Sequence, residues 1–131
     1  MTNISFVFEH GLIFIPITLT HEGNSLTFKK CIVDTGSSGT TFEVSLAEKI
    51  GLNPSPESTI RFLTAIGGKE SVYTRMIDKI YIGDKILNNK HVEFGDLETT
   101  FHIDGIIGND ILRNFNVEIC YKNQIMSLNE Y

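Results

Sequence analysis

Hydrophobic residues recur at every second position over much of the chain, which is the period of a β-strand with one buried face. The alternation is clear near the start, in Ile4, Phe6 and Phe8, and again at residues 13–19, where four apolar side chains share one face. A cluster of turn-forming residues follows at 21–25, so residues 26–33 are expected to return as the second strand of a hairpin. Further strands are predicted at residues 60–65, 71–82, 85–87, 92–94, 116–121 and 125–128.

Two helices are expected, and both are short. Ser45 and Glu48 have the spacing of a capping box, in which each side chain binds a free backbone amide of the first turn. Gly51 is suited to end this helix, because glycine readily adopts the left-handed conformation of a helix exit. A second helix is expected at residues 109–114. The sequence therefore predicts one all-β domain over residues 1–131, with two helical segments.

Composition and charge exclude several classes of function. The 131 residues are 41% hydrophobic and carry a net charge of −5 with no block of like charges, so nucleic-acid binding is not expected. No run approaches the roughly 18 consecutive apolar residues of a membrane-spanning helix. The first residues lack the basic region of a signal peptide. A cytoplasmic protein without membrane contact is expected.

The cysteines and histidines give little sign of a metal or redox site. Cys31 and Cys120 each sit in an apolar, strand-like run and are expected to be buried free thiols. There is no C-x-x-C pair, and the four histidines have no i, i+4 pairing, so no metal site is expected.

The most informative stretch begins where the apolar run 31–33 ends, at Asp34-Thr35-Gly36-Ser37. Glycine and small hydroxylic residues directly after an aspartate predict a tight loop that presents a carboxylate at the end of a strand. Taken alone, the motif is also typical of a turn aspartate that binds its own backbone amides.

Two further segments make the catalytic interpretation the better one. Ile106-Ile107-Gly108 runs into the second predicted helix, and residues 64–69 form a glycine-tipped turn between two strands, which suits a mobile hairpin. In this order, the three elements resemble the retropepsin-like aspartic proteases, which are the retroviral proteases and their cellular and bacterial relatives. The resemblance covers about residues 28–128. It implies a closed β-barrel, expected as a twofold dimer, that cleaves a polypeptide substrate without a cofactor.

The resemblance also implies a role for each matching residue. Asp34 matches the catalytic aspartate, and Thr35 the residue whose hydroxyl interlocks two active-site loops. Gly36 matches the glycine whose carbonyl faces the substrate, and Ser37 the small residue that hydrogen-bonds the carboxylate. Flap and pocket residues follow from the same match: Ala65, Ile66, Gly67 and Gly68 at the flap tip, and Ile106 and Ile107 beside the loop, partly lining a side-chain pocket.

The sequence departs from the retroviral pattern at two positions. The retroviral enzymes carry an acidic residue where Ser38 stands and an arginine where Asn109 stands, and those two residues form an ion pair. Here the pair is missing, and Asp110 follows, as in many cellular relatives. The retroviral style of interface support is therefore not expected, whereas the catalytic loop is intact.

Peptide hydrolysis by this chemistry requires two carboxylates around one water, and the chain has one Asp-Thr-Gly. A weak internal repeat places Asp104-Gly105 where the first half has Asp34-Thr35-Gly36, but the second copy lacks the hydroxyl residue, so Asp104 is expected to be structural. The second carboxylate is expected from an identical chain related by a twofold axis. Strands at residues 4–8 and 125–128 are the expected interface.

Other functions fit the motif less well. Enzymes that form an aspartyl phosphate need a lysine or second aspartate close behind the nucleophile, together with a magnesium site, and Thr35-Gly36-Ser37 supplies neither. Residues 36–39 form neither a G-x-S-x-G elbow nor a P-loop with its lysine. The alternative from another class is a dimer of the same fold that binds peptides or supports assembly without useful turnover. The intact motif at Asp34 favours the enzyme.

Overall fold

The computed structural model describes residues 2–65 and 68–131, and its first long elements are β3 (Leu12–His21) and β4 (Asn24–Val33), the hairpin expected from the alternation. The two residues between these strands, Glu22 and Gly23, both have positive φ, of 49° and 82°. Such a two-residue turn matches the right-handed twist of paired strands. The inward residues of β3, Ile15, Ile17 and Leu19, are at most 1% exposed.

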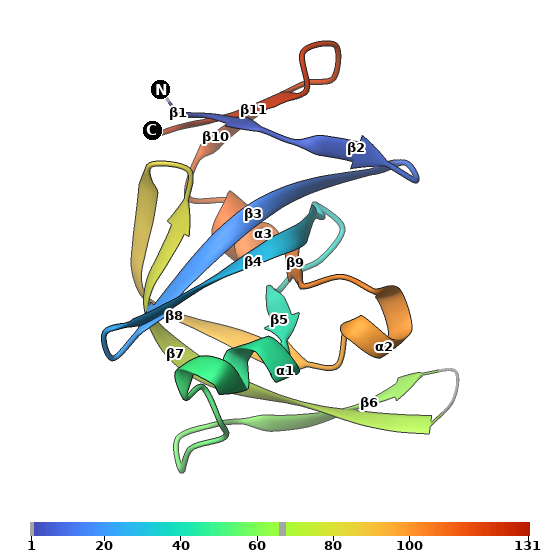
Figure 1. Ribbon diagram of the computed structural model, residues 1–131, viewed down its shortest axis with the longest axis vertical. Coiled ribbons are helices and arrows are strands. Elements are labelled where there is room, and N and C mark those ends of the chain that lie inside the picture. The colour runs from blue at the N-terminus through green and yellow to red at the C-terminus, as the bar shows by residue number, and fades with distance from the viewer. Residues whose placement is uncertain (1, 66–67) are drawn as a thin grey trace.

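Six strands close into a barrel, which confirms the expected all-β closed-barrel fold (Figure 1). β4 is parallel to β9 (Gly105–Ile107), and β9 joins β5 (Thr41–Glu43). β5 is parallel to β8 (Lys85–Gly95), which pairs with β7 (Gly68–Ile82). The barrel closes because β3 also pairs with β7, with Leu19 opposite Ile80. Large side chains fill the interior, among them Phe28, Phe42 and Phe94, each fully buried.

The terminal segments form a separate three-stranded sheet at one end of the molecule (Figure 1). Its order is β1 (Thr2–Ser5), β11 (Ile125–Asn129) and β10 (Asn116–Cys120). The first predicted strand is split at Phe6, because β1 pairs with β11 whereas the following strand, β2 (Val7–Glu9), pairs with β3. The strand at 125–128, expected as interface material, is the central strand of this sheet within one chain.

Two helices were expected, and the described residues contain three short α-helices and one 3₁₀ turn. The first helix is α1 (Val44–Ala47), which continues as the 3₁₀ turn η1 (Glu48–Ile50) and ends at Gly51 with φ of 80°. The expected Ser45–Glu48 capping box was wrong, since the side chain of Glu43 accepts the hydrogen bond from the Ser45 amide. The second expected helix is α3 (Asn109–Leu112), and α2 (Glu98–Phe101) was not anticipated.

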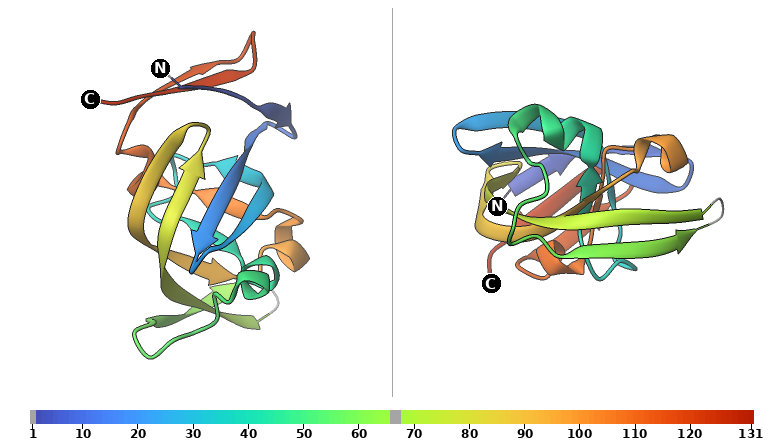
Figure 2. Two further views of the ribbon diagram at one scale, coloured as in Figure 1. Left: turned by 60° about the vertical axis from the view of Figure 1, so that its left-hand side comes forward. Right: turned by 90° about the horizontal axis from the view of Figure 1, so that it is seen from below.

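The edge strand β6 (Ile60–Ala65) pairs only with β7 among the described residues and forms a long hairpin with it. Figure 2 shows this hairpin extending beyond the rest of the barrel. Two short strands expected at 85–87 and 92–94 are one continuous strand, β8. Within residues 2–65 and 68–131, no helix is long and apolar enough to span a lipid bilayer.

The two cysteines differ in their surroundings. Cys31 is fully buried inside the barrel, as expected, but Cys120 is exposed at the end of β10. The expectation of burial was wrong for Cys120 because alternate residues of β10 face the solvent. Burial and the nearby charge of Asp104 raise the pKa of the Cys31 thiol far above its ordinary range. A thiol in that state is not a nucleophile.

Candidate active site

Asp34 is the first residue after β4, where the strand leaves the barrel. β4 runs parallel to β9, with Val33 beside Ile107, and the Asp34 amide donates to the carbonyl of Ile107 at 2.9 Å. Parallel neighbours end at the same edge of a sheet. The loop that begins at Asp34 and the segment Gly108-Asn109 therefore emerge side by side, although about seventy residues separate them in sequence.

The Asp34 carboxylate is oriented by its own loop. Its Oδ1 accepts a hydrogen bond from the Gly36 amide at 2.8 Å. The backbone carbonyl of Asp34 accepts a hydrogen bond from the Ser37 amide at 3.2 Å. A Cβ at position 36 would lie only 3.1 Å from Oδ1, so glycine leaves room for the carboxylate. The Ser37 hydroxyl donates to the Gly39 carbonyl at 2.7 Å. This differs from the expected bond between Ser37 and the carboxylate, because the hydroxyl donates within its own loop instead.

Residues after β9 hold the other side of the loop. The Asn109 side-chain amide donates to the Thr35 carbonyl at 2.7 Å, and the Asn109 backbone amide donates to the Ser37 carbonyl at 2.8 Å. Asn109 thus contacts the loop directly at the position where retroviral enzymes have an arginine. A Cβ at Gly108 would lie 2.4 Å from the Gly39 carbonyl oxygen. Only glycine permits this close approach of the two segments.

Asp110 and Thr40 fasten the end of the loop to α3, and the sequence interpretation assigned them no role. The Asp110 carboxylate accepts from both the amide and the hydroxyl of Thr40, and the Thr40 hydroxyl in turn accepts from the Gly108 amide. A signal was present in the sequence, because a threonine closes the first motif and an aspartate follows the second. Neither residue, however, predicts the other.

Asp104, which the weak internal repeat aligns with Asp34, contacts β4 and not the Asp34 loop. Its side chain accepts from the Lys30 amide at 3.0 Å, and its own amide donates to the Lys30 carbonyl. Asp104 therefore pairs with β4 four residues before Asp34. Gly108, not Asp104, lies next to Asp34, because the strands are in register at Val33 and Ile107. The expectation that Asp104 is structural agrees with these contacts.

A family model described as "Aspartyl protease" matches residues 17–111, which include the loop, both flanking strands and the start of α3. The chain belongs to the aspartyl protease family. Among curated protein sequences, none matches this chain.

Two solved structures share the aspartyl protease fold seen here. A retropepsin-like aspartic protease from Rickettsia conorii is 19% identical, with a TM-score of 0.68, over 96% of this chain and 98% of that one. The retroviral protease-like domain of Ddi1 from Leishmania major is 17% identical, with a TM-score of 0.61, over 92% of this chain and 90% of that one. Structural similarity at this low sequence identity establishes the fold alone. Conclusions about chemistry therefore depend on the residues of this chain.

The segment expected to form a flap is the β6–β7 hairpin. Ala65 and Gly68 are the last paired residues of the two strands. Ile66 and Gly67, expected at the flap tip, lie outside the described residues.

The two isoleucines before Gly108 face different sides of β9. Ile107 is fully buried in the barrel core, whereas Ile106 is half-buried and packs against a small cluster of Phe14, Leu97 and Ile103. Side chains alternate along a strand, so both cannot face one pocket. The expectation that both line a pocket is therefore wrong for Ile107. Ile106 stays the candidate, and its neighbour Leu97 directly precedes α2.

Glu43 anchors α2 from inside the protein. It is 3% exposed, and its Oε1 accepts from the amides of Leu97 and Glu98, at 2.7 and 2.8 Å. Burial alone would raise the pKa of Glu43. Hydrogen bonds from the Ser45 hydroxyl and from the amides of Glu98, Ser45 and Leu97 outweigh burial and hold this pKa below its ordinary value. Glu43 is therefore a buried, ionised carboxylate that ties β5 and α1 to α2.

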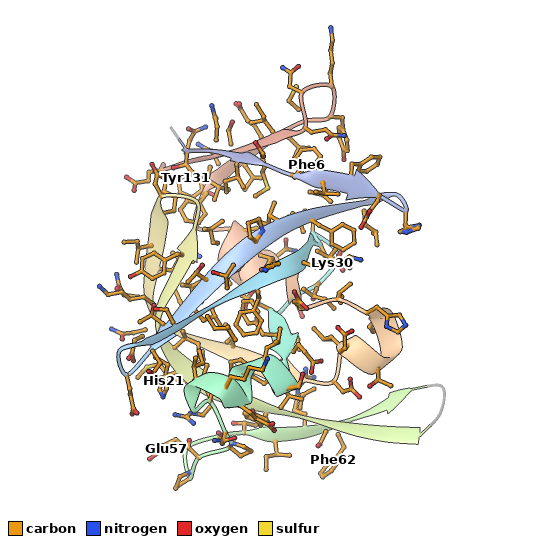
Figure 3. All side chains as sticks on the ribbon, in the orientation of Figure 1. Phe6, His21, Lys30, Glu57, Phe62 and Tyr131 are labelled. Carbon is orange, nitrogen blue, oxygen red and sulfur yellow. The ribbon has the colours of Figure 1, made fainter. Side chains whose placement is uncertain are left out.

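The structure also contains a cavity of about 380 Å³ on another part of the barrel, lined by residues that include His21, Glu57 and Arg75. β4 begins near this cavity and ends at Val33, directly before Asp34, so the two sites lie at opposite ends of a ten-residue strand. His21 and Glu57 are labelled in Figure 3. Within the described parts of the chain, no three His, Cys, Asp or Glu side chains are grouped to hold a metal ion.

Proposed function

We propose that the protein is an aspartic endopeptidase whose active site forms between two identical chains, each contributing Asp34. The observation that carries this proposal is the Asp34 loop. Its carboxylate is fixed by the Gly36 amide, and the loop is held from the far side by Asn109 and Gly108. Such fastening keeps a reactive group in one geometry, which catalysis requires.

One chain contributes one carboxylate of this kind, so a second copy is needed for the chemistry. Thr35 is exposed at the loop surface, where a second copy could contact it. A twofold axis beside Thr35 would bring the two Asp34 side chains together. Two carboxylates about 3 Å apart share a single proton, because both cannot ionise at neutral pH without strong repulsion.

The shared proton defines the reaction. The ionised Asp34 removes a proton from water, and the water oxygen bonds to the carbonyl carbon of the peptide. The protonated Asp34 of the other copy donates to the peptide nitrogen, the carbon–nitrogen bond breaks, and an acid and an amine leave. The rate should therefore rise and fall with pH in a bell-shaped profile, since one aspartate must be ionised and one protonated.

The first test compares wild type with Asp34→Asn in cleavage of an unstructured protein substrate. The amide keeps the shape of the side chain but cannot exchange protons, so cleavage should fall at least a thousandfold, while circular dichroism and sedimentation stay unchanged. A variant that retains a tenth of the activity would refute this mechanism. If wild type and variant bind peptides equally and neither cleaves, the protein is a peptide-binding module instead.

A second test uses dilution of the full-length chain. Active sites made from two chains disappear when dimers dissociate, so the cleavage rate per chain should fall at concentrations below the dimer dissociation constant. Sedimentation measured on the same samples gives the dimer fraction. Constant specific activity in a sample that sediments as a monomer would contradict the two-chain site.

A further inference from the structure

Arg61 and Glu93 form a bidentate ion pair between the flap hairpin and the barrel. Arg61 Nη2 lies 2.7 Å from Glu93 Oε2 and 2.8 Å from Oε1, and Arg61 Nε lies 3.2 Å from Oε2. The Glu93 side chain is 20% exposed and that of Arg61 is 54% exposed. A planar guanidinium matched to both carboxylate oxygens is the strongest form of such a contact.

The strand register explains why these two side chains meet. Arg61 pairs with Val72 of β7, and two residues further along β7 Thr74 pairs with Glu93 of β8. Arg61, Thr74 and Glu93 therefore share one face of the sheet, and the ion pair reaches across β7. Phe62, the next residue of β6, is 73% exposed and points away from the barrel (Figure 3). Because neighbouring residues of a strand face opposite sides, Arg61 faces inward.

Glu93 stands at the end of the active-site loop. It pairs with Thr41, its amide donates to the Thr40 carbonyl at 3.0 Å, and a Cβ at Gly39 would lie 3.7 Å from its Oε1. Thr40 is the residue that Asp110 fastens to α3. The ion pair thus connects β6 to the segment that continues directly from the Asp34 loop.

The ion pair also lies where the hairpin leaves the barrel. β6 pairs with β7 from Ile60 to Ala65, whereas the pairing of β7 with β8 reaches only as far as Tyr73 opposite Phe94. Beyond that point, the paired ends of β6 and β7 are bonded to each other and not to β8 (Figure 2, right). The ion pair therefore lies at the boundary between the part of the hairpin that belongs to the barrel and the part that extends beyond it.

We propose that Arg61 and Glu93 form a latch that fixes the β6–β7 hairpin relative to the active-site loop and so positions the hairpin over a bound polypeptide. The effect of the latch on cleavage rests on the proposed protease function. Its effect on the β6–β7 hairpin does not depend on that function. Both residues are positioning residues, since neither contacts the reacting atoms.

The experiment compares wild type with Glu93→Gln, Arg61→Lys and the double exchange Arg61→Glu with Glu93→Arg. Asp84→Asn is the matched control, because it removes one negative charge at the opposite, exposed end of the β7–β8 pair. Amide hydrogen exchange of residues 61–65 and 68–72 reports on the hairpin. Peptide cleavage gives kcat and KM separately, and thermal unfolding checks that each variant is folded.

Glu93→Gln should speed exchange of the hairpin amides about two- to fivefold, the range of one surface ion pair. Arg61→Lys should have a smaller effect in the same direction, because an ammonium keeps the charge but loses the planar fork. The double exchange should return the rate toward wild type. Added salt should speed exchange in wild type and leave Glu93→Gln unchanged. Cleavage should show a raised KM with kcat nearly preserved.

Unchanged hairpin exchange in Glu93→Gln would overturn the latch, as would an equal effect of Asp84→Asn. If the double exchange fails to fold, the single variants and the salt series decide the matter. If wild type cleaves no peptide, the proposed protease function fails, and the exchange measurements still decide the latch.

Discussion

The Asp110 carboxylate lies 2.7 Å from the Thr40 hydroxyl, although 70 positions separate the two residues in sequence. The same carboxylate accepts from the Thr40 amide at 3.2 Å and from the Ile111 amide at 2.9 Å. The Thr40 hydroxyl also accepts a hydrogen bond from the Gly108 amide at 3.0 Å. One aspartate therefore joins the end of the Asp34 loop to the first turn of α3.

Removing the Thr40 hydroxyl should weaken the loop more than shortening the side chain does. Thr40 is 1% exposed, so Thr40→Val leaves the Gly108 amide and the Asp110 carboxylate without their shared partner, at a cost of about 2 kcal/mol. Thr40→Ser keeps the hydroxyl and is the matched control, with a loss of about 1 kcal/mol for one methyl group. Urea unfolding measures both values. Equal losses for the two variants would show that packing, not the hydrogen bonds, matters at this position.

Gly108→Ala should disrupt the active-site loop. The added Cβ would lie 2.4 Å from the Gly39 oxygen and 2.8 Å from the Ser37 oxygen, and both are backbone atoms that cannot rotate away. Since the Gly108 backbone is extended, with φ of −100°, the effect is steric and not conformational. The free energy of unfolding should fall by about 3 kcal/mol or more, and any cleavage activity should be lost.

Gly39→Ala provides the control for this steric effect. It makes the same chemical change in the same loop, but its Cβ would meet only Glu93 Oε1, at an ordinary contact distance of 3.7 Å. Its loss should stay below about 1 kcal/mol. Chemical denaturation of both variants and wild type gives the comparison. A stable, active Gly108→Ala protein would mean that the two segments can separate without harm.

Glu43→Gln should lower stability at neutral pH and remove part of its dependence on acid. An amide nitrogen in place of one carboxylate oxygen would face amide donors, so the loss at pH 7 should be about 2 kcal/mol. The pKa of Glu43 is lowered in the folded protein, so its contribution is present above the unfolded pKa of about 4.3 and disappears as pH falls through the lower folded value. Unfolding curves from pH 7 to pH 2 should therefore converge for the two proteins. A gap that stays constant with pH would show that Glu43 is not ionised.

Deletion of residues 125–131 should destabilise the whole protein and not simply release a folded monomer. Met126 and Leu128 are fully buried, and β11 is bonded on both sides, by β1 and β10. Loss of two buried side chains alone removes about 3–6 kcal/mol, which is a large part of the stability of a typical domain. Thermal unfolding followed by circular dichroism tests this expectation. A truncated chain that melts within a few degrees of wild type would show that the terminal sheet is dispensable.

Much of the barrel could be predicted from sequence because its cause is local. Alternation in β3 and β4 puts Ile15, Ile17 and Leu19 on one face whatever the rest of the chain does, and the turn between them depends on the adjacent Glu22 and Gly23. The Asp34-Thr35-Gly36 loop is local in the same sense. Its small residues permit a tight turn, and the Gly36 amide reaches the Asp34 carboxylate two positions away.

Tertiary structure alone decided the contacts that cross the barrel. The parallel register of β4 and β9 places Gly108 beside Asp34 and Asp104 beside Lys30. This register depends on the packing of the whole sheet. The same packing made β11 a central strand and buried Ile107. A periodic pattern indicates which residues are buried, but it carries no information about the partner of each strand. Asp34 was therefore evident in the sequence, and the groups that hold its loop became visible only in the folded chain.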